Sequence, residues 1–552
     1  MVYNFGLILL LISVCSHYID GDVIRKTQYG LIRGELKVSK VDENVKYYSF
    51  MGVPYASPPI GHLRFQNPIK HESWYGVRNT TTLPDSCVQL DQNFITDDVN
   101  GSEDCLYLEI SEPLTARNGS GELLPVLVWI HGGTFVFGAP RVSGPDYLME
   151  KPIVYINLQY RLNVFGFLST MDESASGNFG LKDQLFALKW IQRNVVNFGG
   201  DPNRVTISGA SAGAASVLFH CLSPKSQGLF HRAISLSGTP LNRWVLQRNP
   251  LEKVHKLAKG FGINPANTSE IVQGLRQVDH RDLMRAVYDP SIMGENIPYY
   301  VHPFAPSIET VSPTAFITDR AFKLLAKGNF AKVPHLIGHT TEEGSFAYEY
   351  IHLGAASIDL YEKSPETLIP SSMNIPQGAP CVKETVDEVK AFYFKNNAVT
   401  DAFNWINYMS QDLFNRGVAK TAQFLAKETD VYYYILSYNG TRPMSFFGGV
   451  GHYEDILYLF YPRKRWSNIE SPLDSLVRKR LVTIWANFVT TGNPTPQSDP
   501  LLQNTIWPKF TEDESYLDIN KELKIRKGPE KKDRDFWEEL FGRCGFEPYY
   551  TY

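Results

Sequence analysis

Residues 204–215 read RVTISGASAGAA and place one serine, Ser211, between Gly209 and Gly213. The β-branched run before the serine predicts a strand, and the alanine-rich run after it predicts a helix. A serine hydroxyl is a weak nucleophile that must be exposed, held and deprotonated as it attacks. A tight strand-to-helix turn exposes such a side chain at the carboxyl edge of a sheet, and the glycines relieve the crowding there. The stretch therefore predicts a G-x-S-x-G nucleophile elbow.

Short apolar runs recur along the chain and are separated by helix-like stretches. They are near-continuous, as is typical of parallel strands covered on both faces, and they occupy residues 124–130, 152–160, 204–208, 232–237, 333–338 and 430–438. Helical patterns follow at 181–195 and 471–492. This alternation predicts an α/β fold with a central, mostly parallel sheet and helices on both faces. The stretches 240–330 and 345–430 have few strand-like runs, and we expect helical insertions there over the carboxyl edge.

The expected strand at 124–130 runs directly into HGGTFVFG, residues 131–138. Adjacent glycines allow the backbone N–H groups of Gly132 and Gly133 to point into a cavity. With the N–H of Ala212, which follows the serine, they would bind a developing alkoxide as an oxyanion hole. An ordinary glycine turn after a strand explains these glycines, but not their combination with an elbow later in the chain.

An acid and a histidine should follow the serine in that order. The expected strand at 333–338 runs into HTTEEGSF and offers Glu342 or Glu343, and the strand at 430–438 leads to FFGGVGHYED and offers His452. All three groups would emerge at the carboxyl ends of strands, where open α/β sheets place their sites. A single histidine among thirteen is more often structural. The order of the residues and the glycine-rich approach favour His452.

Longer stretches resemble the type-B carboxylesterase/cholinesterase family of α/β-hydrolases from about residue 24 to 545. The matching stretches are FMGVPYASPPIGHLRF, SEDCLYL, HGGTFVFG, YRLNVFGF, GNFGLKDQLFALKWIQRNVVNFGGDPNRVTISGASAGAAS and GVGHYEDILYLF. The resemblance implies an α/β-hydrolase fold and a serine esterase with a Ser–His–Glu triad, in which the acid is Glu343 rather than Glu342. It also implies that Trp244, in SGTPLNRW, lines the acyl pocket.

Departures from the family pattern narrow the range of substrates that we expect. Cholinesterases carry Glu before the nucleophile and a Trp in the loop closed by their first disulfide, whereas this chain has Ala210 and no Trp in residues 88–104. A quaternary ammonium would lose a carboxylate and its best π face, each worth about 1 kcal/mol. GVGHYED, with Asp455 three places after His452, resembles a motif of insect juvenile hormone esterases, which usually carry Gln where Ala210 stands. We therefore expect a carboxylesterase for small apolar esters, with juvenile hormone or odorant and pheromone esters as narrower alternatives.

The family also includes neuroligin-like adhesion proteins, which keep the fold and have lost catalysis. They usually lack a member of the triad and continue into a transmembrane stalk. Here Ser211, Glu343 and His452 are all present, and the chain ends soon after the matching region. The enzyme is the preferred hypothesis, and the adhesion protein is the alternative from another class.

Residues 5–15, FGLILLLISVC, form an apolar run that is too short to span a bilayer and is typical of a signal peptide. A buried N-terminal strand is the alternative. We expect a leader over residues 1–21, a single carboxylesterase-type domain over 22–552, and secretion. No later run approaches about 20 apolar residues, so no membrane anchor is expected.

Sequons and cysteines also indicate an extracellular protein. Five Asn-X-Ser/Thr sequons lie in loop-like surroundings, at Asn79, Asn100, Asn118, Asn267 and Asn439.

Cys87 and Cys105 flank a polar loop, which predicts a loop-closing disulfide, and they match the first disulfide of the family. Cys221, in the apolar stretch VLFHCL, is expected to be a buried free thiol. The sequence provides no connectivity for Cys381 and Cys544.

The net charge and the distribution of Cys and His argue against nucleic acid and metal ions as partners. The net charge is −4 without a clustered basic block, so we expect no nucleic acid. No Cys/His cluster indicates a metal, and the expected chemistry requires no cofactor.

Overall fold

The computed structural model describes residues 22–552 except for 91–97, 115–120, 141–142, 265, 294–302, 353–357, 377, 396–397, 442, 446, 463–470, 547–548 and 550. The expected leader over residues 1–21 and the sequon at Asn118 lie outside the described residues. Within these ranges, no helix is both long and apolar enough to cross a membrane.

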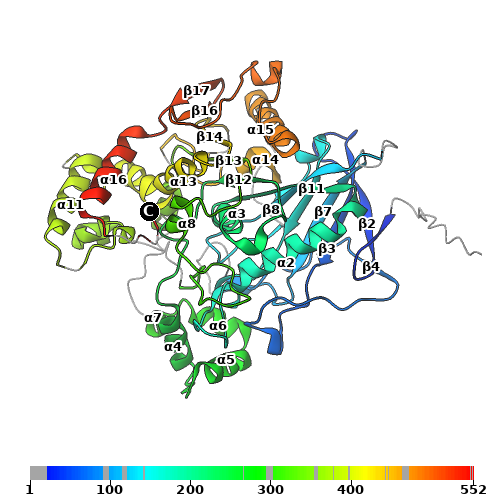
Figure 1. Ribbon diagram of the computed structural model, residues 1–552, viewed down its shortest axis with the longest axis horizontal. Helices are drawn as coiled ribbons and strands as arrows, with labels where there is room; N and C mark the ends of the chain where they lie inside the picture. Colours follow the sequence, from blue (N-terminus) through cyan, green and yellow to red (C-terminus); the bar gives the residue numbers. More distant parts are fainter. Residues whose placement is uncertain are drawn as a thin grey trace, which may run out of the picture.

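A thirteen-stranded sheet runs through the described part of the chain (Figure 1). Its centre is parallel, in the order β10 (Val154–Leu158), β8 (Leu124–Ile130), β11 (Gly200–Ala210), β12 (Arg232–Leu236), β13 (His335–Thr340), β14 (Val431–Leu436) and β16 (Ser515–Ile519). All six strands expected from the apolar runs are in this central part. The predicted mostly parallel sheet is confirmed.

Antiparallel strands complete both edges of the sheet. One edge has β1 (Asp22–Lys26), β2 (Leu31–Val38), β3 (Lys46–Pro54) and β7 (Tyr107–Pro113), with β4 (Val77–Asn79) beside β2, and the other has β17 (Leu523–Lys527). Two small sheets pair β5 (Gln89–Leu90) with β6 (Val99–Asn100), and β9 (Ser143–Gly144) with β15 (Tyr461–Pro462). These edge strands were not expected from the apolar runs.

Helices bury both faces of the sheet. Residues Val126, Val128 and Ile130 of β8 belong to one hydrophobic cluster, together with residues of α2 (Phe179–Asn194) and α3 (Ala212–Leu222). The alternate residues Leu127 and Trp129 belong to a second cluster, with residues of α15 (Pro472–Thr491). Since successive side chains of a strand point to opposite faces, the two clusters are the two sides of the sheet.

The remaining helices include two groups of insertions and the chain end. Between β12 and β13 lie α4 (Pro250–Gly260), α5 (Thr268–Gln277), α6 (His280–Ala286), α7 (Pro290–Met293) and α8 (Ala321–Ala326). Between β13 and β14 lie α9 (Ser345–His352), α10 (Asp359–Lys363), α11 (Cys381–Val389), α12 (Ala402–Ser410) and α13 (Arg416–Ala426). Two short helices, α1 (Asn163–Phe167) and α14 (Ile456–Leu459), and the last helix, α16 (Lys531–Cys544), complete the described chain. The helical insertions predicted for 240–330 and 345–430 are present (Figure 1).

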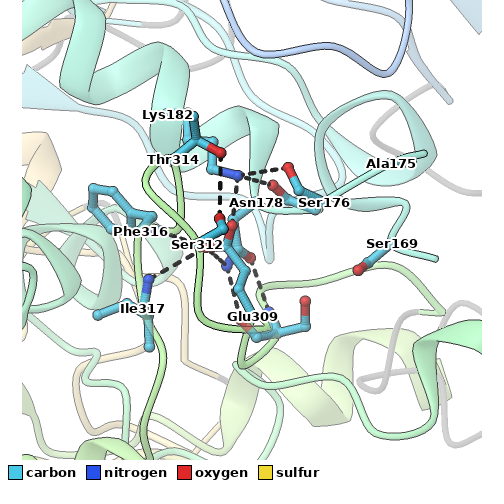
Figure 2. A network of polar contacts seen from close by, with 12 residues as sticks. Ser169, Ala175, Ser176, Asn178, Lys182, Glu309, Ser312, Thr314, Phe316 and Ile317 are labelled. Carbon is cyan, nitrogen blue, oxygen red and sulfur yellow. Dashed lines mark hydrogen bonds and ion pairs between the residues drawn. The ribbon is translucent and has the colours of Figure 1, made fainter. Parts of the chain in front are cut away.

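A buried polar network fastens the segment between α7 and α8, within the first insertion, to the start of α2 (Figure 2). The Lys182 ammonium lies 2.5 Å from Glu309, and Asn178 Nδ2 donates to Glu309 Oε2 at 2.8 Å and to the Ser307 carbonyl at 2.7 Å. The Phe316 N–H donates to the same carboxylate oxygen at 2.8 Å. Burial lowers the pKa of Lys182, and the charge of Glu309 opposes this. Removing one partner of such a buried pair costs about 3–5 kcal/mol, so this network holds the two segments together.

Candidate active site

Ser211 occupies the turn between β11 and α3 that the sequence predicts. Its backbone has φ 56° and ψ −121°, a conformation that non-glycine residues rarely adopt. A Cβ atom on Gly209 would lie 2.5 Å from the backbone of Gly213, and one on Gly213 would lie 2.0 Å from the Ile130 carbonyl oxygen. Both positions therefore require glycine because the backbones meet there. The Ser211 N–H donates to the Leu236 carbonyl at 2.8 Å, which fixes the turn to the next strand.

The glycine loop after β8 lies directly against this turn. A Cβ atom on Gly132 would come within 2.6 Å of the Ala210 carbonyl oxygen and 3.1 Å of Ser211 Cβ. Gly133 has φ 102°, which only glycine adopts readily. The expected oxyanion residues Gly132, Gly133 and Ala212 are thus brought together around Ser211.

His131 fixes the orientation of one peptide in this loop. Burial lowers the pKa of His131 to about 4, so its imidazole is neutral and Nδ1–H donates to the Gly132 carbonyl at 2.9 Å. The ring also stacks on Tyr160, whose hydroxyl donates to the His131 carbonyl at 2.9 Å. Because a peptide carbonyl and its N–H point in opposite directions, holding the Gly132 carbonyl also sets the direction of the Gly133 N–H. Sequence reasoning found this loop but did not assign a role to His131.

The structure pairs His452 with Glu343. His452 Nδ1 forms a buried hydrogen bond with Glu343 Oε2, and Glu343 Oε1 accepts from Ser237 Oγ at 2.5 Å and from the Thr340 N–H at 2.7 Å. Burial alone would raise the pKa of Glu343, but the charge of His452 and these hydrogen bonds outweigh it and lower the pKa. The carboxylate is therefore held ionised beside the imidazole. Ser237, which sequence reasoning missed, carries no motif that would reveal it.

Glu342, the other acid that the spacing allowed, has a different environment. Its N–H donates to the Val450 carbonyl at 2.8 Å, and its backbone forms a parallel bridge with Gly451. Its carboxylate accepts a hydrogen bond from Ser445. Glu342 thus holds the loop that carries His452, while Glu343 contacts the imidazole itself.

Two further acids lie two and three residues after His452. Burial and the charge of Glu343 raise the pKa of Asp455 to about 7, and the Tyr434 hydroxyl donates to it at 2.8 Å. Burial also raises the pKa of Glu454 to about 7, although the N–H of Gly451 donates to it at 2.9 Å. These carboxyls titrate close to neutral pH behind the histidine.

Aromatic side chains surround the imidazole. The ring of Phe414 lies 4.3 Å from that of His452, and the ring of Phe346 lies 5.1 Å from it. Trp244 packs on Phe414 at 5.7 Å, and its indole N–H donates to the Leu413 carbonyl at 2.8 Å. The expected acyl-pocket residue Trp244 is therefore joined to the site through Phe414, and the surroundings are apolar.

Phe414 belongs to a π-helical turn, Gln411–Asn415, that joins α12 to α13. Such turns insert one residue into a helix and are frequent at functional sites. They have no sequence signature of their own, because the apolar spacing resembles that of an ordinary helix. This explains why Phe414 was not identified from the sequence.

Cysteines and sequons complete the comparison with the expectations. Cys87 and Cys105 form the expected disulfide, and Cys221 is buried and unbonded as expected. The four described sequon asparagines are all exposed, at Asn79, Asn100, Asn267 and Asn439. The first two lie on the short strands β4 and β6, so the expectation of loop-like surroundings was wrong for them.

Comparison with known proteins agrees with this architecture. Residues 21–537 match the model of the carboxylesterase family. The chain is 33% identical to the juvenile hormone esterase of Tribolium castaneum, over 90% of this chain and 87% of the relative. It is 35% identical to esterase E4 of Myzus persicae, over 83% and 84% of the two chains. The crystal structure of the juvenile hormone esterase of Manduca sexta, with OTFP covalently attached, superposes with a TM-score of 0.83 at 29% identity, and the match covers 94% of this chain and 100% of the other.

The central parallel sheet, its covering helices and the strained serine turn define an α/β-hydrolase. Within that class, the chain belongs to the carboxylesterase family. It is a carboxylic ester hydrolase, with esters as its substrates.

Proposed function

We propose that the protein is a secreted serine esterase that cleaves apolar carboxylic esters. Ser211 is the nucleophile, His452 is the general base, and Glu343 is the carboxylate that orients His452. The observation that carries this proposal is the contact of His452 with Glu343, next to a serine in a strained elbow. The position of Tyr453, which follows His452 in the chain, also supports a place for His452 beside Ser211. A Cβ atom on Gly132 would lie 3.1 Å from both the Tyr453 ring and Ser211 Cβ.

In the proposed mechanism, His452 takes the proton from Ser211 as its oxygen attacks the ester carbonyl. Glu343 keeps the imidazole oriented and stabilises its charged form without accepting the proton. The oxyanion is bound by the N–H groups of Gly132, Gly133 and Ala212, each worth about 3 kcal/mol to the transition state. The alcohol leaves with the proton from His452. Water then cleaves the acyl-enzyme by the same steps in reverse.

The substrate class follows from the surroundings of the site. Ser211 is only 3% exposed, so an ester must be enclosed to react. The walls near His452 are rings of Phe346, Phe414 and Trp244, which offer no charge to a polar acyl group. We propose that Trp244 bounds the acyl pocket and that small apolar esters are preferred. The names of two relatives support juvenile hormone as a narrower candidate, to be tried beside simple aryl esters.

Secretion, the domain organisation and glycosylation are part of the same proposal. We propose that residues 1–21 form a cleaved leader and that residues 22–552 form one domain. The match to the family from residue 21 onward supports that boundary. Exposure of Asn79, Asn100, Asn267 and Asn439 supports their use as glycan acceptors.

The decisive experiment compares hydrolysis of a short-chain aryl ester by the wild type and by Ser211→Ala, with an organophosphate label in parallel. We expect kcat to fall by about five to six orders of magnitude in the variant, and the label to be found on Ser211. Ser498→Ala, at an exposed position, is the matched control and should keep full activity. A wild type that neither hydrolyses esters nor takes the label would contradict the proposal and favour an adhesion protein.

A pH–rate profile tests the base separately. Protonated His452 cannot accept the Ser211 proton, so kcat/KM should fall on acidification. A profile without any loss of activity on acidification would exclude His452 as the base.

A further inference from the structure

Helices α11 and α16 lie against each other (Figure 1). Cys381 is the first residue of α11, and Cys544 is the last residue of α16. Their sulfurs are unbonded, and a side-chain hydrogen bond joins the two thiols and raises the pKa of Cys381. Cys544 is buried, and the partly exposed Cys381 packs against the same hydrophobic cluster. Two thiols far apart in the sequence are thus neighbours in the fold.

Contacts on both sides of this cysteine pair hold it in place. Arg543, one residue before Cys544, pairs with Glu384 at 3.6 Å and Glu388 at 2.5 Å, both on α11. Two residues after Cys544, the Phe546 N–H donates to the Met373 carbonyl at 2.8 Å. The chain around each cysteine is therefore bound to the chain around the other.

The same alignment continues beyond the carboxyl end of α11. Phe392 stacks on Phe536 of α16 with 4.0 Å between the ring centroids. The Trp537 indole N–H donates to the Tyr393 hydroxyl at 2.7 Å. The two segments run in opposite directions with a fixed register, so the cysteines cannot slide apart without breaking these contacts.

We propose that Cys381 and Cys544 form a second disulfide, which staples the C-terminal helix to the insertion between β13 and β14. The proposal rests on the proposed secretion, because a disulfide persists in an oxidising compartment, and does not rest on the esterase activity. The accessible Cys381 thiolate attacks a disulfide of a secretory thiol oxidant and forms a mixed disulfide. The Cys544 thiolate then displaces the oxidant, which leaves as a dithiol with two electrons, while the two cysteine protons end on the oxidant or in solvent.

The staple would act on a helix that supports the proposed acyl pocket. Trp537 of α16 lies under the buried Arg416 guanidinium at 4.6 Å, and Arg416 pairs with Asp412 at 3.4 Å. Asp412 also binds Arg243, the neighbour of Trp244, at 3.0 Å. Holding α16 in place therefore holds the π-helical turn that carries Phe414.

The test is mass mapping of the full-length protein, secreted from a eukaryotic host and digested without reduction after alkylation. We expect one peptide pair joined through Cys381 and Cys544, which separates on reduction, and alkylated Cys221 as an internal free-thiol control. Recovery of Cys381 and Cys544 as alkylated free thiols would overturn the staple. The Cys87–Cys105 link in the same digest shows whether the protein passed through an oxidising compartment. Aryl ester hydrolysis by the same sample tests the proposed activity. A failure of the second disulfide can therefore be told apart from a failure of the proposed function.

Single and double variants measure what the staple does. Cys381→Ser, Cys544→Ser and the double variant should all lower the thermal midpoint by a similar amount, about 4 °C for a loop of this length in a chain of this size. Equal losses are expected because each variant removes the same bond. An unchanged midpoint in Cys381→Ser, whose side chain is partly exposed, would overturn the proposal.

Discussion

The elbow at Ser211 and the Glu343–His452 pair are held in place by different means. The elbow is fixed by its own neighbours, since Gly209 and Gly213 let strand and helix backbones touch within five residues. The pair is fixed by segments more than a hundred positions apart, which meet only in the folded sheet. A short motif therefore encodes the turn of the proposed nucleophile, whereas the geometry of the proposed acid and base exists only in the complete fold.

The largest effect should come from breaking the local arrangement with Gly213→Ala. The new Cβ would lie 2.0 Å from the Ile130 carbonyl oxygen, so β8 and the elbow must separate and displace Ser211 and the glycine loop together. We expect kcat/KM for an aryl ester to fall by about 10⁵-fold, close to the loss expected for Ser211→Ala. Thermal unfolding of the same sample should show a lower midpoint.

Gly542→Ala is the matched control for that change. Gly542 lies in α16, where an added Cβ meets no atom within 4 Å. The substitution should leave activity unchanged and stabilise the helix by about 0.5–1 kcal/mol. Full activity in Gly213→Ala would show that the elbow tolerates a side chain and that its geometry is not set locally.

The contact between Glu343 and His452 is tested by comparing the variants Glu343→Gln and Glu342→Gln. Glutamine at 343 keeps the shape and loses the charge that stabilises the imidazolium of His452, so kcat should fall by about 10⁴-fold. Glu342 contacts Ser445 and the loop backbone instead, so its amide variant should lose less than about 10-fold. Steady-state kinetics of both variants would decide between the two acids, and equal losses would contradict the assignment of Glu343.

The contrast between locally fixed and long-range structure also explains what the sequence could predict. The six central strands were predictable because both of their faces are buried and their residues are apolar throughout. Strands β1 and β2 were missed because exposed Ile24, Leu31 and Leu36 obscure the pattern of a half-buried edge. Among site residues, those in glycine motifs could be predicted, and Glu343 was selected through the resemblance alone. Phe414 and Ser237 could not be predicted, because tertiary packing alone brings them to the site.

A smaller effect is expected at the proposed acyl pocket. Trp244→Ala would open space beside Phe414, so the ratio of kcat/KM for a longer acyl chain over acetate should rise by about 10- to 100-fold. Trp485→Ala, in the cluster on the opposite face of the sheet, is the matched control. It should cost stability and leave the ratio unchanged. An unchanged ratio in Trp244→Ala would place the acyl group elsewhere.

The smallest effect concerns the buried acid behind His452. The pKa of Asp455 is raised to about 7, above the ordinary value of 3.8, so the folded state keeps a proton that the unfolded state has lost between these values. Stability therefore falls as pH rises from about 4 to 7 through this group, and Asp455→Asn removes that dependence.

Asparagine can still accept the Tyr434 hydroxyl, so the change isolates the charge. Relative to the wild type, we expect Asp455→Asn to gain about 2 kcal/mol more at pH 8 than at pH 5 in urea unfolding. An equal shift at both pH values would mean that Asp455 is ionised throughout, and that the loop beside His452 tolerates a buried negative charge next to Glu343. The result therefore measures how far the Glu343–His452 pair, unlike the elbow, depends on the protonation of residues outside the proposed triad.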